Sequence, residues 1–421
     1  MTILLIGSGG REHAIATALA ASPHTTKLFC APGNGGIANV AECVNIAATD
    51  VAGVVDFAES HGVDLVFVAS DDPLALGMVD ALEKAGIRAF GPRQNAAIIE
   101  SSKAFSKSFM AKYGIPTAAH ATFSDCDAAL AYIRERGAPI VVKADGLALG
   151  KGVIVAQTVA AAEEAVRSIM LDRRFGESGA RVIIEEFMTG REVTVLAFTD
   201  GATVVPMLSS QDHKRVFDGD EGPNTGGMGA ICPCPLYTET LAAQCVDMIF
   251  RPTIDGLRAE GREFRGVIYF EIMLTPQGPR VIEYNARFGD PEAQAVLPML
   301  DTDLVDICNA VVDGRLAELP IRWKSGASCC VVMASEGYPS EYEKGRVISG
   351  LDDVPSDITV YHAGTKRDGD GYVTNGGRVL GVTARGDTLK AAIARAYDGV
   401  AAIRWDGAHF RRDIGHHALQ K

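Results

Sequence analysis

Residues 281–290 read Val-Ile-Glu-Tyr-Asn-Ala-Arg-Phe-Gly-Asp, where an apolar start followed by alternating polar side chains predicts a β-strand. Glu283 and Asn285 lie two residues apart and share one face of this strand, which Arg287 continues. The strand-like run before it carries Glu271, a second carboxylate. Carboxylate and amide oxygens from neighbouring strands suit Mg²⁺ that bridges the phosphates of ATP. A lone Glu-x-Asn is usually an exposed polar strand face, but the apolar start and Glu271 favour a metal site.

Length, composition and charge exclude several classes of function. The chain has 421 residues, 47% hydrophobic and 22% charged, as expected of a globular protein with several domains. A net charge of −13 argues against general binding to nucleic acid or anionic membranes. Nine cysteines without a paired framework indicate reduced thiols. Because we also find no signal peptide and no membrane-length apolar window, we expect a cytoplasmic protein.

The N-terminal region has two informative features, its alternation of strands and helices and a glycine-rich turn. Residues 1–101 alternate short apolar runs with helical patterns, which predicts a doubly wound parallel sheet. The turn at residues 7–13, Gly-Ser-Gly-Gly-Arg-Glu-His, follows the first strand and opens a helix, where N–H groups can bind phosphate. The third glycine of a dinucleotide fingerprint is missing, and Glu12 would repel a pyrophosphate. We therefore favour a single phosphate at Gly9 and Gly10, with a ligand-free tight turn as the alternative.

A second α/β unit follows, at about residues 120–190, with a size compatible with a mobile lid. Lys143 ends an apolar strand, where an unpaired cation would be costly. The glycine-rich loop at 146–152 is not a P-loop, because its glycines are too close and Gly152 replaces the metal-binding Ser or Thr. Lys143 and this loop still suit ATP phosphates.

Two further segments are candidates for ligand contacts. The acidic strand end Ile-Ile-Glu-Glu-Phe-Met, residues 183–188, and Glu192 can contact adenine and ribose, although acidic strand ends are common. Residues 209–228, the substrate loop, are rich in Gly, Asp and Asn and contain Gln-Asp-His-Lys-Arg. A loop of this length is more often functional than accidental, although a solvated charge run has the same composition. Residues 237–260 are predicted to form one helix.

Taken together, these motifs resemble the ATP-grasp superfamily and, more closely, the family of phosphoribosylamine–glycine ligases (glycinamide ribonucleotide synthetases). The segments that carry the resemblance are Gly-Ser-Gly-Gly-Arg-Glu-His (7–13), Ala-Pro-Gly-Asn (31–34), Lys-Ala-Asp-Gly-Leu-Ala (143–148), Ser-Gln-Asp-His-Lys-Arg (210–215), Gly-Pro-Asn-Thr-Gly-Gly-Met-Gly-Ala (222–230), Arg-Phe-Gly-Asp-Pro-Glu (287–292), His-Ala-Gly-Thr (362–365) and Thr-Asn-Gly-Gly-Arg-Val-Leu (374–380). They run in order from end to end of the chain, which makes the resemblance specific.

The resemblance implies an α/β fold in three domains: an N-terminal doubly wound parallel sheet (1–101), a central ATP-grasp module (102–315) with its small mobile lid, and a C-terminal β-rich α+β domain (326–421). It implies ATP-dependent ligation of glycine to 5-phosphoribosylamine through a glycyl phosphate, a step of de novo purine synthesis. The implied cofactor is Mg²⁺ or Mn²⁺, and the implied partners are small-molecule substrates of a monomer.

The resemblance also implies roles for individual residues. Arg287 is the expected catalytic residue. The expected nucleotide contacts are Lys103, Lys143, Gly150, Lys151, Gly152, Glu185, Glu186, Phe187 and Glu192. The expected substrate contacts are Gly9, Gly10, Asp212, Lys214, Thr225, Gly226 and Arg287. The expected metal ligands are Glu271, Glu283 and Asn285.

Two positions depart from the family pattern. The family usually has small residues at the positions of Phe270 and Glu271. Glu271 precedes Glu283 by 12 residues (283 − 271 = 12), which is about the spacing of the two metal-binding carboxylates in other ATP-grasp enzymes. We therefore predict that Glu271 is an additional metal ligand. At Asp71 the family usually has a longer Glu, which leaves its substrate role open. The alternatives are another ATP-grasp ligase or carboxylase of purine synthesis, or a nucleotide-binding regulatory protein without activity.

Overall fold

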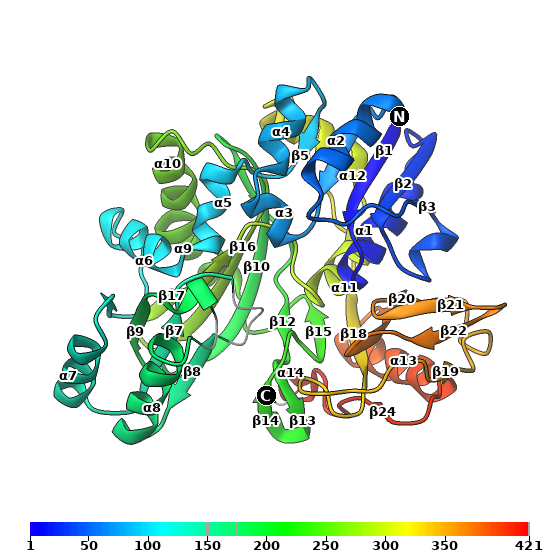
Figure 1. Cartoon of the computed structure of the whole chain (residues 1–421). Helices are drawn as coiled ribbons and strands as arrows, with labels where there is room; N and C mark the ends of the chain where they lie inside the picture. Colours follow the sequence, from blue (N-terminus) through cyan, green and yellow to red (C-terminus); the bar gives the residue numbers. More distant parts are fainter. Residues whose placement is uncertain (148–151, 174–175, 420–421) are drawn as a thin grey trace.

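The computed structural model describes residues 1–147, 152–173 and 176–419. In this part of the chain the strands form six sheets. Figure 1 shows three regions: the blue N-terminal elements at the top, a cyan-to-green group at the lower left, and the orange-to-red C-terminal group at the lower right. None of the helices formed by the described residues is long and apolar enough to span a bilayer.

The N-terminal region is a five-stranded parallel sheet with strand order β3-β2-β1-β4-β5, which confirms the predicted doubly wound sheet. Its strands are β1 (Thr2–Gly7), β2 (Lys27–Pro32), β3 (Glu42–Cys43), β4 (Leu65–Val68) and β5 (Ala89–Phe90). Its helices are α1 (Gly10–Ala20), α2 (Val51–Ser60), α3 (Asp71–Ala75), α4 (Met78–Lys84) and α5 (Gln94–Ser101).

The central strand β1 is buried on both faces, which explains its unbroken apolar sequence. Leu4 and Ile6 belong to one hydrophobic cluster, whereas Ile3 and Leu5 belong to another. This alternation follows from the two-residue period of a strand. The carboxyl end of β1 then delivers the turn at residues 7–13 to the edge where ligands of such sheets bind.

The middle of the chain forms an antiparallel sheet with order β11-β10-β16-β17. Its strands are β10 (Arg191–Asp200), β11 (Val204–Pro206), β16 (Arg265–Thr275) and β17 (Gly278–Asn285). The helical segments of this region are α6 (Lys103–Lys112), α9 (Glu239–Cys245), a π-helical turn (Val246–Phe250), α10 (Arg251–Ala259), α11 (Glu292–Val296) and α12 (Leu304–Val312). Phe270 of β16 packs on Phe250, with ring centroids 4.3 Å apart, so it points away from the face that carries Glu271.

The lid region has its own antiparallel sheet, with order β6-β9-β7-β8, and its own hydrophobic cluster. Its elements are β6 (His120–Phe123), α7 (Cys126–Arg136), β7 (Ile140–Ala144), β8 (Val153–Ala156), α8 (Val159–Met170) and β9 (Val182–Glu186). In Figure 1 this group lies at the lower left, beside the middle sheet.

The C-terminal region is β-rich, as predicted, but its main sheet contains strands from elsewhere. The sheet order is β12-β15-β18-β23-β20, with β24 also paired to β18. The strands are β12 (Gln211–Asp212), β15 (Gly229–Cys232), β18 (Ala327–Ser335), β20 (Ile358–His362), β23 (Arg378–Gly386) and β24 (Ala408–His409), covered by α13 (Leu389–Ala402). The substrate loop is thus joined to the C-terminal sheet, a pairing that its sequence did not indicate.

Smaller elements complete this region. A three-stranded sheet has order β19-β22-β21, from β19 (Val347–Ile348), β21 (Thr365–Asp368) and β22 (Gly371–Thr374). The substrate loop also forms a two-stranded ribbon, β13 (Arg215–Phe217) and β14 (Glu221–Asn224). The short helix α14 (His416–Leu419) lies next to this ribbon in Figure 1.

Candidate active site

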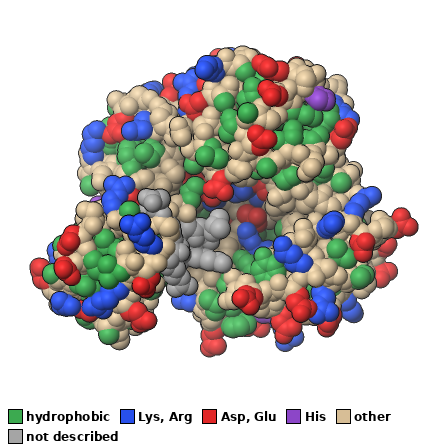
Figure 2. All heavy atoms as spheres, in the orientation of Figure 1, with side chains coloured by type: hydrophobic (Ala, Val, Ile, Leu, Met, Phe, Trp, Pro, Cys, Tyr) green, Lys and Arg blue, Asp and Glu red, His purple; other side chains and the backbone are tan. Residues whose placement is uncertain are grey.

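A cavity of about 1190 Å³ lies where the lid, the middle sheet and the substrate loop meet. Figure 2 shows this face hollowed near its middle, with acidic and basic side chains in the hollow. The predicted site residues that line the cavity are Lys103, Lys143, Gly152, Glu185, Glu186, Phe187, Glu192, Asp212, Lys214, Thr225, Gly226, Glu271, Glu283, Asn285 and Arg287. Gly150 and Lys151 lie outside the described residues.

The predicted metal ligands lie on one face of the β16–β17 pair. Glu271 is directly opposite Glu283, and Tyr269 is opposite Asn285. The register shifts by one residue beyond Glu271, so that Ile282 is the extra residue of a β-bulge. Two carboxylates and an amide oxygen therefore face the cavity together, a donor set that fits a hard divalent cation.

Positive side chains surround these acids. Burial would raise the pKa of Glu283, but Lys103, Lys143, Lys214 and Arg287 together hold it below its usual value. Cations gathered beside oxygen ligands for a metal ion are the surroundings that a bound triphosphate requires, because its negative charge is shared between the two.

Lys214 belongs to the substrate loop and lies between two of the acids. Its ammonium contacts the Glu271 carboxylate and lies 3.1 Å from Oε2 of Glu192. Burial would lower the pKa of Lys214, but these surroundings raise it, with Glu192 as the largest contributor. The substrate loop is thereby tied to the metal-binding face.

Glu185 is held by two lysines. Its carboxylate oxygens lie 2.9 Å from Nζ of Lys107 and 3.0 Å from Nζ of Lys143, and all three side chains are buried. Burial lowers the pKa of Lys107 to about 8. The structure therefore pairs Glu185 with the cations that line the cavity. Lys107 was not predicted, although it stands one helical turn after Lys103, a spacing that puts both lysines on the same face of α6.

The rim of the cavity has an exposed aromatic ring and an ion pair. Phe187 is 38% exposed, enough for a flat ligand to stack on its ring. The carboxylate of Glu186 is bound by Arg280 at 2.6 Å and by the Ala119 N–H at 3.1 Å. For Glu186 to contact adenine as predicted, its backbone must make the contact, or its carboxylate must leave Arg280 and the Ala119 N–H.

A buried acidic network lies at the other end of the cavity. The Tyr269 hydroxyl donates to Oε1 of Glu292 at 2.9 Å, and Thr194 Oγ1 lies 3.1 Å from the Tyr269 hydroxyl. Burial and the nearby Glu292 raise the pKa of Asp212 well above its usual range. Two carboxylates at close quarters favour an ammonium ligand between them. Glu292 lay inside the motif at 287–292 but was not predicted as a site residue.

Arg287 is fixed by neighbours from the N-terminal region. Its Nη2 lies 2.8 Å from Oε1 of Glu100 and 3.1 Å from Oδ1 of Asn285. The other Glu100 oxygen accepts the Ala286 N–H at 2.7 Å. Burial would raise the pKa of Asp71, but Arg287 and Arg11 lower it, which places Asp71 beside Arg287. Glu100 was missed because nothing in its local sequence distinguishes it from another helical acid.

Within the substrate loop, Thr225 and Gly226 serve the loop's own structure. The Thr225 hydroxyl donates to the Lys214 carbonyl at 2.8 Å and accepts the Gly227 N–H at 2.9 Å. The Gly226 N–H donates to the Tyr338 hydroxyl at 3.0 Å. Both residues line the cavity, so a substrate contact remains a prediction for them.

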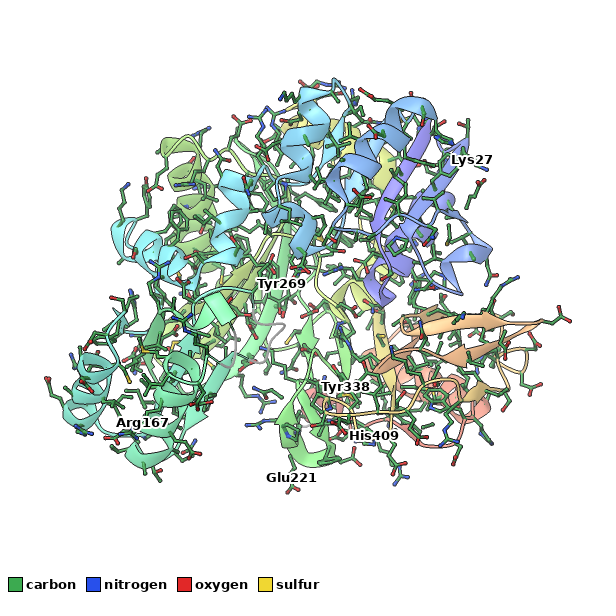
Figure 3. The ribbon with its side chains drawn as sticks, in the orientation of Figure 1. Lys27, Arg167, Glu221, Tyr269, Tyr338 and His409 are labelled. Carbon is green, nitrogen blue, oxygen red and sulfur yellow. The ribbon has the colours of Figure 1, made fainter. Side chains whose placement is uncertain are left out.

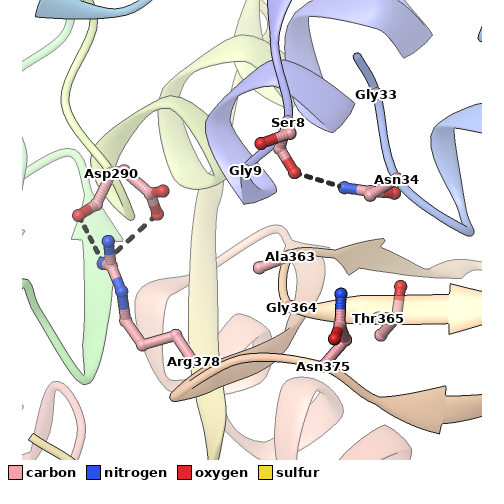
Figure 4. Close-up of a pocket in the computed structure, with 10 residues that line it drawn as sticks. All are labelled: Ser8, Gly9, Gly33, Asn34, Asp290, Ala363, Gly364, Thr365, Asn375 and Arg378. Carbon is pink, nitrogen blue, oxygen red and sulfur yellow. Dashed lines mark hydrogen bonds and ion pairs between the residues drawn. The ribbon is translucent and has the colours of Figure 1, made fainter. Parts of the chain in front are cut away.

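A second cavity, of about 320 Å³, lies between the turn at residues 7–13 and the C-terminal strands (Figure 4). Ser8, Gly9, Gly33, Asn34, Asp290, Ala363, Gly364, Thr365, Asn375 and Arg378 line it. Asn34 Nδ2 crosses the gap between domains, donating to the carbonyls of Ser8 and His362, at 2.8 Å each.

The two glycines predicted to bind phosphate differ in position. The Gly9 N–H faces the helix start and donates to Oε2 of Glu12 at 2.6 Å. Gly10 is packed so closely that a Cβ there would lie 2.6 Å from Nε2 of Gln294. Gly9 lines the smaller cavity and Gly10 does not, so the polar groups that face a ligand there come mainly from other residues.

The two cavities share a border. Arg378 and Asp290 line both, and Nη1 of Arg378 lies 3.3 Å from Oδ1 of Asp290. The same nitrogen donates to the carbonyls of Gly226 at 2.8 Å and Asp290 at 2.6 Å. Arg378 was missed, although it lies in the quoted segment 374–380, because its partners are remote in sequence.

Comparison with known proteins identifies the family. Models described as Phosphoribosylglycinamide synthetase match residues 1–100 (N domain), 101–293 (ATP-grasp (A) domain) and 328–417 (C domain). Phosphoribosylamine–glycine ligase of Allochromatium vinosum is 50% identical over 425 residues, covering 100% of this chain and 99% of that protein. The chain belongs to the phosphoribosylamine–glycine ligase family. The same enzyme of Vibrio vulnificus strain YJ016 is 49% identical, with equal coverage.

Solved structures agree with this assignment. The crystal structure of phosphoribosylamine–glycine ligase from Thermotoga maritima matches with a TM-score of 0.87 and 30% identity, covering 98% of this chain and 100% of that one. The biotin carboxylase domain of Hydrogenobacter thermophilus 2-oxoglutarate carboxylase, solved with MgADP, has a TM-score of 0.76 at 16% identity and covers 97% of this chain and 91% of that one. The latter likeness concerns the fold alone.

As a phosphoribosylamine–glycine ligase family member, the chain is an ATP-dependent carbon–nitrogen ligase of purine biosynthesis. Its substrates are small molecules, and its family uses ATP with a divalent metal ion. The opposed carboxylates in the larger cavity fit that chemistry.

Proposed function

We propose that the chain joins glycine to 5-phosphoribosylamine, producing glycinamide ribonucleotide, ADP and phosphate, through a glycyl phosphate intermediate. The observation that carries this proposal is the pair of cavities that meet at Asp290 and Arg378. One is large and rich in cations, as a nucleotide requires. The other is small and polar, and it opens beside the acidic end of the first.

ATP occupies the larger cavity, with its triphosphate near Lys103, Lys143 and Gly152. Gly150 and Lys151, which lie outside the described residues, keep their expected role as nucleotide contacts. Phe187 supports the adenine, while the strand end at Glu185 and Glu186 and the carboxylate of Glu192 serve the base and the ribose. The support for these roles is that the described members all line one cavity, which also holds the exposed ring of Phe187.

Mg²⁺ is the metal of this site, because oxygen ligands from Glu271, Glu283 and Asn285 suit a hard cation. When bound, the ion neutralises phosphate charge and orients the γ-phosphoryl group for transfer. Mn²⁺ accepts the same oxygen ligands and is the alternative metal for this site.

Glycine binds with its ammonium between Asp212 and Glu292, where burial and mutual repulsion create a strong preference for a cation. A carboxylate oxygen of glycine attacks the γ-phosphorus, the bond to the β-phosphate oxygen breaks, and ADP leaves. Arg287 stabilises the charge on the phosphoryl oxygens, because Glu100 holds its guanidinium at the cavity wall.

The acceptor occupies the smaller cavity with its phosphoribosyl group, next to Ser8, Gly9 and Asn375. Its amine reaches across the Asp290–Arg378 border and attacks the acyl carbon of glycyl phosphate. The bond from that carbon to the phosphate oxygen breaks, phosphate leaves, and the nitrogen loses a proton. Both cavities are lined by one chain, which supports action as a monomer, and the nine free cysteines suit a reducing compartment such as the cytoplasm.

The test combines ADP release with an isotope label. ADP release should require glycine and freshly prepared 5-phosphoribosylamine together with ATP and Mg²⁺. When the carboxylate of glycine carries ¹⁸O, one labelled oxygen should appear in the released phosphate, because the acyl phosphate passes that oxygen to phosphorus. Release of unlabelled phosphate would exclude the glycyl phosphate intermediate. ADP release at the same rate with and without glycine would exclude the proposed reaction. A molar mass from light scattering equal to a dimer would contradict the monomer.

A further inference from the structure

His213 stands between two residues of the proposed substrate site, Asp212 and Lys214, yet its side chain faces the other way. All three residues are among those that line the larger cavity, but their side chains have different partners. The buried His213 ring bonds to Gly229 and Gly415, whereas the Asp212 carboxyl lies near Glu292 and the Lys214 ammonium contacts Glu192 and Glu271. The alternation of an extended segment requires this arrangement, because adjacent side chains point to opposite sides. Whatever holds the His213 ring therefore also sets the direction of Asp212 and Lys214.

Both ring nitrogens of His213 are engaged by backbone groups. Nδ1 lies 3.2 Å from the carbonyl of Gly229, and Nε2 accepts the N–H of Gly415 at 3.0 Å. This pattern requires a neutral ring with its proton on Nδ1. Burial, with Arg411 nearby, lowers the pKa of His213 to about 4, in agreement with a neutral ring. The Gly415 contact spans 202 residues of sequence.

Gly415 is part of a longer tail segment, residues 409–415, that lies against the substrate loop. The Arg411 guanidinium is fully buried and donates to Asp220 at 2.8 Å and to the Arg215 carbonyl at 3.1 Å. Asp413 accepts the Gly219 N–H at 2.8 Å.

Two further contacts continue this row along the ribbon. The Arg412 N–H donates to Asp218 at 2.7 Å, and His409 Nε2 lies 2.8 Å from the Val216 carbonyl. Figure 3 shows His409 beside the ribbon whose tip carries Glu221. The row of contacts therefore follows the loop from His213 to its tip.

The tail segment is itself anchored to the C-terminal domain. The Tyr397 hydroxyl of α13 donates to the Arg411 carbonyl at 2.8 Å and accepts the Ile414 N–H at 3.1 Å. The substrate loop is thus connected through the tail to a rigid helix of another region.

We propose that His213 is a positioning residue of the ligase reaction, and that the tail segment, through the Gly415 N–H bond to His213, aims Asp212 at glycine and fixes the direction of Lys214. This inference rests on the proposed function, which places the ammonium of glycine at Asp212. The C-terminal domain would then contribute to glycine binding through the tail segment, in addition to lining the smaller cavity.

Two substitutions separate the two halves of the His213 contact. In His213→Gln, the amide oxygen can reach the position of Nε2 and still accept the Gly415 N–H. In His213→Asn, the shorter amide reaches the position of Nδ1 and keeps only the Gly229 contact. The tail contact is therefore retained in one variant and lost in the other, although both remove the ring.

We expect His213→Asn to raise the KM for glycine about tenfold, the effect of one lost buried hydrogen bond, while His213→Gln stays within about threefold. The dissociation constant of ATP should change by less than about twofold in both, because this contact lies outside the nucleotide region. Intact ATP binding also shows that each variant is folded. The matched control is His409→Gln, in which the amide nitrogen reaches the position of Nε2 and keeps the contact of the tail with the Val216 carbonyl.

A surface variant extends the test without disturbing a buried group. Asp218→Ala removes the acceptor of the Arg412 N–H and should raise the glycine KM about threefold, as expected for a partly exposed hydrogen bond. Glu221→Ala, at a nearby exposed acid, is its control and should leave the KM unchanged.

Three results would overturn the inference. The first is a glycine KM of His213→Asn equal to that of the unaltered chain, and the second is a loss of ATP affinity in His213→Asn as large as its rise in glycine KM. The third is an acid limb of the pH–rate profile near pH 6.5 that disappears in His213→Gln. The last would make His213 a general acid or base. An unaltered chain that releases no ADP with glycine would instead refute the proposed function, so the two failures are distinguishable.

Discussion

Glu271 faces Glu283 directly across the β16–β17 pair, and the same Glu271 carboxylate contacts the ammonium of Lys214. Glu271 thus joins the metal-binding face to the substrate loop. A change at Glu271 should therefore act on both the metal-binding face and the substrate loop.

Glu271→Gln should weaken metal binding in the presence of ADP by about tenfold or more, as is typical when a group close to a metal is altered. The reason is the loss of one of the two opposed carboxylates. Electron paramagnetic resonance of Mn²⁺ measures the affinity directly. Glu192→Gln is the control, because it removes the other partner of Lys214 and leaves the opposed pair intact. An unchanged Mn²⁺ affinity in Glu271→Gln would show that this residue is only a partner of Lys214.

ATP binding should weaken above pH 8. Burial lowers the pKa of Lys107 to about 8, so its charge is present below that pH and is lost above it. Glu185 then keeps Lys143 as its remaining cation, and the cavity becomes less attractive to a triphosphate. Equilibrium binding of ATP between pH 7 and pH 9.5 should reveal the decrease, and Lys107→Arg should abolish it. Lys112→Arg changes an exposed lysine five residues further along α6 and should behave like the unaltered chain. If ATP binding by Lys107→Arg still weakens above pH 8, the decrease does not come from Lys107.

The contact of α1 with β20 should make the protein sensitive to acid. His13 Nδ1 accepts the His362 N–H at 2.8 Å, and burial lowers the pKa of His13 to about 3 and that of His362 to about 4. Because both pKa values in the folded protein lie below the usual histidine value of 6.5, the unfolded chain binds more protons as the pH falls below 6.5. Stability therefore decreases from pH 6.5 towards pH 4, by about 2 kcal/mol per histidine at pH 5.

Urea unfolding at pH 7 and pH 5 measures this decrease. His13→Asn should reduce it by about a third, because the lowered pKa values of His362 and His213 remain, while the Asn amide oxygen still accepts the His362 N–H and does not titrate in this range. His24→Gln, at an exposed position, should leave the decrease unchanged. The same loss of stability in His13→Asn as in the unaltered chain would assign the acid sensitivity to other groups.

Arg378→Met should impair use of the acceptor and spare ATP. The side chain forms the border of both cavities and neutralises Asp290. Its removal takes the nearest cation from the half-buried Asp290 carboxylate, which keeps the Gln294 hydrogen bond, so stability should decrease. We expect kcat/KM for 5-phosphoribosylamine to fall by about 100-fold or more, an effect within the range for a lost charged contact, with the ATP dissociation constant unchanged.

The double variant Asp290→Asn with Arg378→Met should recover stability but not activity, because it removes the unpaired charge without restoring the guanidinium. Arg395→Met removes a half-buried arginine of the same domain that pairs with Asp357 and Asp398, away from both cavities, and serves as the control. Equal acceptor kinetics in Arg378→Met and Arg395→Met would contradict the role.

Local patterns were sufficient for much of the fold. The buried strand at Thr2–Gly7 and the pairing that places Glu271 opposite Glu283 follow from short-range alternation, which is where sequence carries most information. The predicted helix at 237–260 is interrupted by a π-helical turn before Pro252, because a proline in a helix interior lacks the N–H of the regular ladder.

The rest of the site depended on contacts between distant segments. Glu100, Glu292 and Arg378 meet their partners across separate regions, so neither spacing nor hydrophobic period distinguishes them. His213 lay in a recognised motif, but only its contact with Gly415 explains the orientation of its neighbours. The residues missed are those that hold or join the predicted ones.

The strand β15 pairs with β18, although almost a hundred residues of sequence separate them. A gene divided between residues 316 and 325 would therefore produce two polypeptides that each lack part of one sheet. When produced alone, the C-terminal piece would expose the unpaired edge of β18 and should therefore aggregate. Produced together, the two pieces should associate and regain activity, so the break between the family's second and third regions in sequence is not a break in the folded molecule.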